Sequence, residues 1–108
     1  MDDRIRQLAE FMGWEEINYP NDGPMWRHCD CHWIRYKAPP DPFTDANDCN
    51  ALIKHLNEQG AWRVNINIES HGDYVKIWRY KSPDTQEIYW EGDNWMHGVA
   101  ALALKVLK

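Results

Sequence analysis

The sequence lacks several features that would assign it to a well-defined class. None of its 108 residues belongs to an apolar run approaching the roughly 18 residues of a membrane span. The opening residues MDDRIRQLAE are acidic and amphipathic, without the basic segment, apolar run and cleavage site of a signal peptide. Its three cysteines are odd in number and cannot all pair within one chain. These absences predict a cytoplasmic protein.

Positive charge is also scarce. Twelve Lys and Arg residues stand against 17 Asp and Glu residues, a formal net charge of −5. Direct nucleic-acid binding is therefore not expected, because it requires a basic face, whereas docking onto a basic protein surface is compatible with this charge. The six glycines form no phosphate-binding loop, and no catalytic motif is evident. We expect a non-enzymatic protein without a cofactor.

Large aromatic side chains, by contrast, are abundant. The chain has seven tryptophans and five tyrosines, more than a small core normally needs. Apolar residues make up 44% and charged residues 27%, which is ordinary globular usage. We therefore predict a single domain over residues 1–108 with some of its aromatic side chains at an interface, either with another protein or in a homodimer.

Hydrophobic periodicity predicts the elements. Apolar residues at helical spacing indicate helices over 2–12, from Thr44 or Asp45 to Gly60, and from Asp93 or Asn94 onward. A strand is predicted over 25–36, and three more over 62–69, 74–80 and 85–90 form a meander. The expected fold is α+β: a largely antiparallel sheet of about four strands packed with three helices, in the order α-β-α-β-β-β-α.

The stretch His28-Cys29-Asp30-Cys31-His32 has the composition of a zinc site. In an extended strand, however, neighbouring side chains point to opposite faces, so these five residues cannot converge on one ion. One face supplies at most His28, Asp30 and His32, and a tetrahedral structural site needs a further ligand. We expect an ordinary strand, with Cys29, Cys31 and Trp33 toward the core. The alternative is a zinc-binding protein that uses this segment.

The strand over 62–69 alternates strictly, with Val64, Ile66 and Ile68 on one face. Its opposite face, with neighbouring strands, forms a polar surface that carries aromatic side chains, a composition favoured in protein recognition. Either this surface binds a protein, or a helix covers it. The candidate protein-binding residues are Arg63, Asn65, Asn67, Glu69, Lys76, Trp78, Tyr80 and Tyr89.

Three segments resemble the phage ABA sandwich domain family of small phage and prophage proteins. They are Met12-Gly13-Trp14 after the first helix, Pro42-Phe43-Thr44-Asp45 before the second, and the Ala/Leu-rich stretch 100–107. The resemblance implies a sheet between helices and a phage-encoded accessory protein without catalytic residues. We therefore expect a protein that acts in the cytoplasm of a host bacterium and binds a bacterial or phage protein. Inhibition of a host defence system, as by anti-CRISPR proteins, is the expected role. The segment around His28 is not part of the resemblance.

Overall fold

The computed structural model describes residues 3–107, without the side chains of residues 31–34. The described part is α+β, as predicted, but it has six strands in two antiparallel sheets instead of about four strands in one. The elements are α1 (Asp3–Phe11), β1 (Trp14–Tyr19), β2 (Gly23–His28), β3 (Cys31–Tyr36), α2 (Ala46–Gly60), β4 (Arg63–Glu69), β5 (Gly72–Lys81), β6 (Asp84–Gly92) and α3 (Trp95–Val106).

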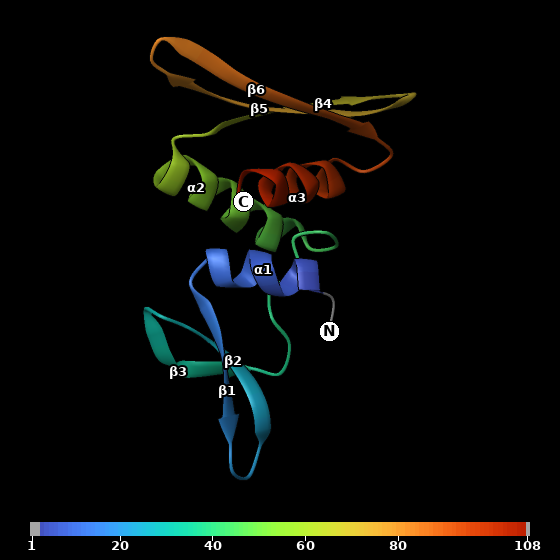
Figure 1. The fold of residues 1–108 in the computed structure, drawn as a ribbon. Coiled ribbons are helices and arrows are strands. Elements are labelled where there is room, and N and C mark those ends of the chain that lie inside the picture. Colours follow the sequence, from blue (N-terminus) through green and yellow to red (C-terminus); the bar gives the residue numbers. More distant parts are fainter. Residues whose placement is uncertain (1–2, 108) are drawn as a thin grey trace.

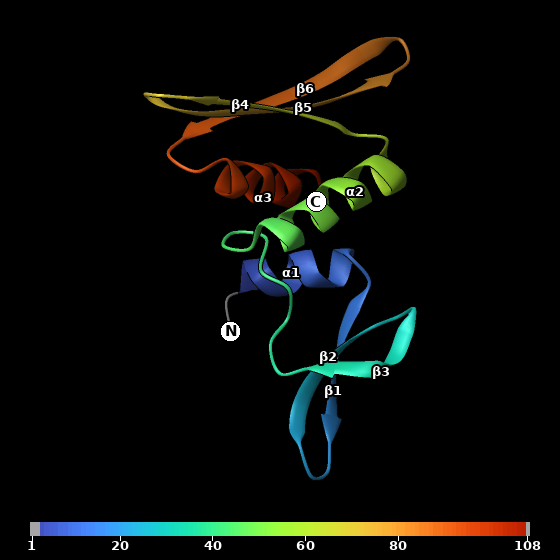
Figure 2. The same ribbon diagram turned by 180° about the vertical axis from the view of Figure 1, so that it is seen from behind.

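The helices lie between the two sheets (Figures 1 and 2). The sheet β4-β5-β6 covers α2 and α3 on one side, α1 lies beneath these two helices, and the sheet β1-β2-β3 projects beyond α1. This is the reverse of the expected sheet between helices. The principal-axis extents are 49 × 36 × 20 Å. The radius of gyration is 15.3 Å, against about 13 Å for a compact domain of this length, so the molecule is elongated.

The hydrophobic core lies where α3 meets the sheet β4-β5-β6 and the other two helices. α3 contacts α1, α2 and all three strands of that sheet, as expected for a helix that is apolar on most sides. Val75 and Ile77 of β5 are fully buried against it, and so is Cys49 of α2. Cys49 is thus the small core residue that its helical spacing indicates.

Local sequence signals explain the helix ends. The Asp45 carboxylate accepts hydrogen bonds from the backbone N–H groups of Asn47 (2.8 Å) and Asp48 (3.1 Å), which makes it the N-cap of α2. Asn94 caps α3 in the same way through Met96 N–H at 3.0 Å. Gly60, expected to end α2, is its last residue, and the left-handed position belongs to Ala61 (φ 56°).

The segment 25–36, predicted as one strand, is part of a β-hairpin. β2 ends at His28, Cys29 and Asp30 form a two-residue turn, and β3 begins at Cys31. The prediction was wrong because this turn contains none of the glycine, proline or asparagine residues that usually mark one. It was also incomplete, because β1 precedes the hairpin and pairs with β2 from Trp14↔His28 to Tyr19↔Gly23.

The sheet β1-β2-β3 is joined to α1 by a small number of side chains. Trp26 of β2 is only 1% exposed, and the Arg6 guanidinium of α1 lies 5.4 Å from its ring centroid. Arg6 also pairs with Glu16 of β1 at 3.4 Å. No helix among the described residues is long and apolar enough to cross a membrane.

Candidate functional site

The eight candidate protein-binding residues all lie on the face of β4-β5-β6 that is turned away from the helices. Arg63 pairs with Trp78, and Asn65 pairs with Lys76, which pairs in turn with Tyr89. Residues directly opposite one another in an antiparallel sheet share a face, as do residues two apart in one strand. Figure 1 shows α2 and α3 on the other side only, so no helix among residues 3–107 covers this face.

We call this surface the outer face. Besides the eight predicted residues it includes Tyr74, Thr85, Glu87 and Glu91, which the register places beside them. Tyr74 was missed although it alternates with Lys76 and Trp78 along β5, a signal that the sequence itself contains. The outer face is therefore richer in tyrosine than predicted.

Aromatic contacts organise the outer face. The Tyr74 and Tyr89 rings lie 5.8 Å apart between centroids, and the Arg63 guanidinium lies 5.4 Å from the Trp78 ring. The Tyr89 hydroxyl donates a hydrogen bond to the Glu87 carboxylate, and this bond raises the pKa of Tyr89. Held in this way, Tyr89 is still 50% exposed, and Tyr80 is 68% exposed.

A hollow of about 490 Å³ lies at the end of the sheet where β4 turns into β5. Four carboxylate residues line it: Glu69, Asp73, Glu91 and Asp93. Asp73 accepts a hydrogen bond from Trp95 N–H at 2.8 Å, and Glu69 lies 3.0 Å from the His71 ring. Two carboxylates thus have a partner on the chain, and the hollow as a whole is acidic.

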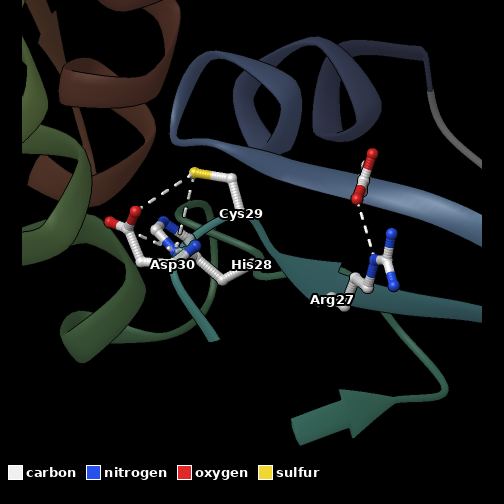
Figure 3. A network of polar contacts seen from close by, with 5 residues as sticks. Arg27, His28, Cys29 and Asp30 are labelled. Atoms are coloured by element: carbon white, nitrogen blue, oxygen red, sulfur yellow. Dashed lines mark hydrogen bonds and ion pairs between the residues drawn. The ribbon is translucent and has the colours of Figure 1, made fainter. Parts of the chain in front are cut away.

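The second candidate site is the β2–β3 turn, shown in Figure 3. Cys29 Sγ lies 3.9 Å from His28 Nδ1 and 3.8 Å from Asp30 Oδ1, and His28 Nδ1 lies 3.8 Å from Asp30 Oδ2. The expected alternation, which would separate these residues, does not apply because Cys29 and Asp30 lie in a turn. Cys29, expected to face the core, is exposed.

The remaining members of the predicted metal segment are only partly placed. The backbone of Cys31 pairs with that of His28, while the side chains of Cys31, His32 and Trp33 lie outside the described residues. Within the predicted zinc segment, the structure therefore brings together His28, Cys29 and Asp30, whereas the expected alternation put Cys29 on the opposite face from the other two. Their convergence could not be predicted from sequence spacing, because it depends on the position of the turn.

Comparison of the chain with protein-family models, with curated proteins and with solved structures gives no significant match.

Proposed function

We propose that this chain is a non-enzymatic accessory protein, encoded by a phage or prophage, that binds a bacterial or phage protein through the outer face. Inhibition of a host defence system, as by anti-CRISPR proteins, is the role we favour. The observation that carries the proposal is the gathering of Tyr74, Trp78, Tyr80 and Tyr89 on one uncovered sheet face.

These aromatic side chains are suited to binding because the sheet already restrains them. Tyr and Trp have few rotatable bonds, so they bury a large area at a low cost in conformational entropy. The ring contact between Tyr74 and Tyr89 and the bond from Tyr89 to Glu87 restrict them further. Less ordering is then required when a partner binds.

The size of the outer face limits how the partner docks. Ten residues of β5 and three strands side by side cover about 34 × 14 Å, or roughly 500 Å². A standard interface buries about 800 Å² on each partner, so the partner must extend past the sheet. The acidic hollow beside Tyr74 and Glu91 is the adjoining surface that favours a basic partner.

The experiment is affinity capture from a bacterial lysate, followed by measurement of Kd with the purified partner. We expect Tyr80→Ala/Tyr89→Ala to weaken binding at least about 30-fold, since hot-spot residues contribute about 2 kcal/mol or more. Both side chains are exposed, so the fold should persist. Tyr36→Ala is the matched control, because Tyr36 is also 50% exposed but lies in β3.

If the double variant binds the partner as tightly as Tyr36→Ala and the unchanged chain do, the outer face is not the docking surface and the proposal is refuted. If no protein is captured but the chain self-associates, and the double variant abolishes this self-association, then the partner is a second copy of the chain. Gel filtration with light scattering distinguishes these two results.

A further inference from the structure

The β2–β3 turn presents three different metal-ligating atoms at one point, on the opposite side of the helices from the outer face (Figure 1). An imidazole nitrogen of His28, the Cys29 thiol and an Asp30 carboxylate oxygen all lie within 4.8 Å of one another. The binding function proposed above uses none of them. We call these three residues the turn cluster.

The end of α1 holds the turn cluster in place. Cys29 N–H donates a hydrogen bond to Gly13 O at 2.9 Å. His28 Nε2 lies 2.9 Å from Met12 O, and because a carbonyl oxygen only accepts, Nε2 carries the ring proton. Nδ1 accepts a hydrogen bond from Asp30 N–H at 3.1 Å, so its lone pair lies on the side of Cys29 and Asp30 (Figure 3).

This arrangement of His28 is the one that a metal-binding histidine requires. Such histidines donate the N–H of their second ring nitrogen to a carbonyl or carboxylate, which fixes the tautomer and the orientation of the ring. A histidine that served only as a packing residue would not need its other nitrogen beside a thiol and a carboxylate.

The distances fit zinc after a small contraction. Bond lengths of about 2.3 Å to sulfur and about 2.0–2.2 Å to nitrogen and oxygen put the ligand atoms of a tetrahedral site about 3.4–3.6 Å apart. Here Sγ lies 3.9 Å from Nδ1 and 3.8 Å from Asp30 Oδ1, and Nδ1 lies 3.8 Å from the other carboxylate oxygen, Oδ2. With one ligand atom from each residue, all three lie within 4.8 Å of one another. Asp30 is exposed, so its side chain can turn to bring one carboxylate oxygen to bonding distance.

Zinc binding would replace one hydrogen bond, from Asp30 N–H to His28 Nδ1 at 3.1 Å. That N–H lies in an exposed turn, where water can accept its hydrogen bond instead. The ligand set also selects the metal, because a thiolate and an imidazole favour Zn²⁺ over hard cations such as Mg²⁺ and Ca²⁺.

We propose that His28, Cys29 and Asp30 bind one Zn²⁺ ion through Nδ1, Sγ and a carboxylate oxygen, with the fourth position occupied by water. Zinc sites that exchange a water molecule for another ligand have this coordination, with three protein ligands and one open position. Cys49 takes no part, since it is fully buried in the core.

The test is a titration of the chelator-treated chain with Zn²⁺ against a chromophoric chelator, together with absorption spectra of its Co²⁺ form. We expect one ion per chain and a thiolate-to-Co²⁺ charge-transfer band. Cys29→Ser should remove the band and weaken Zn²⁺ binding on the order of 100-fold or more, since even residues that only orient a ligand contribute 10–100-fold.

Asp30→Asn should also weaken Zn²⁺ binding. The controls are His71→Ala and Asp22→Asn, two exposed residues outside the turn cluster, and both should bind as the unchanged chain does. Thermal melts without metal verify that each variant folds. Zinc binding that survives Cys29→Ser, or that the control substitutions weaken equally, would overturn the proposal, as would a Co²⁺ form without the thiolate band.

Discussion

Replacement of Gly13 by alanine tests how firmly the end of α1 holds the β2–β3 turn. Gly13 has φ +90°, a backbone conformation that L-residues rarely adopt. A Cβ at this position would lie 3.0 Å from Cys29 Sγ and 3.0 Å from His28 Nε2. The substitution therefore introduces backbone strain and also pushes the turn away from the helix.

The two costs can be separated, because Gly23 also has a positive φ (+73°), but a Cβ added there would have nothing within 4 Å. Gly23→Ala should lower the free energy of unfolding by about 1–2 kcal/mol from backbone strain alone. Gly13→Ala should have the same cost plus at least about 1 kcal/mol for the contacts. We expect a total of about 2–3 kcal/mol for Gly13→Ala.

Urea unfolding with a chelator present measures both variants without any contribution from metal. The slope of free energy against urea should stay constant, because neither change alters the surface exposed on unfolding. Cys29→Ala in the Gly13→Ala background should recover part of the contact cost. If Gly13→Ala is no more destabilising than Gly23→Ala, the turn is not packed against the helix end as described.

Three further predictions concern α2. Asp45→Ala removes the N-cap of α2 and should lower the free energy of unfolding by about 1 kcal/mol, measured by urea unfolding. Burial raises the pKa of the Cys49 thiol to about 12. In a Cys31→Ser variant at pH 8, a thiol reagent should therefore modify the exposed Cys29 quickly and Cys49 only on unfolding. Burial also raises the pKa of the Asp48 carboxyl. The free energy of unfolding should therefore fall as the pH rises through the pKa of this carboxyl in the unfolded chain and then through its higher pKa in the folded chain. Asp48→Asn should be at least as stable as the unchanged chain at pH 7, with the difference vanishing at pH 3 in urea unfolding.

Each of these three predictions can be contradicted by its measurement. An unchanged free energy of unfolding for Asp45→Ala would mean that the carboxylate does not cap α2. Two thiols reacting at the same fast rate would contradict the burial of Cys49. An advantage of Asp48→Asn that grows toward low pH would reverse the sign of the pKa shift.

Strict alternation made the meander β4-β5-β6 predictable from the sequence. Val64 and Ile66 face the core as expected, although Ile68 remains 69% exposed, so the helices leave that end of β4 uncovered. Which face the helices would cover could not be predicted, since β5 has large apolar groups on both faces. The packing of α3 against Val75 and Ile77 decides it.

The first half of the chain was less predictable. β1 has two adjacent glutamates, Glu15 and Glu16, which disfavour a strand unless tertiary contacts support them. Here Glu15 pairs with Arg27 at 2.8 Å and Glu16 with Arg6 at 3.4 Å, each on another element. The geometry of the turn cluster could not be predicted for a related reason, because it depends on the residue at which β2 ends.

The order of strands in both sheets has a consequence for folding kinetics. Each sheet pairs only strands that follow one another along the chain, β1-β2-β3 and β4-β5-β6. Closing such short loops costs little entropy, and proteins dominated by local contacts fold fast. The strands of each meander can therefore pair without waiting for the other meander, and the rate-limiting event should be the docking of the three helices that buries Val75 and Ile77.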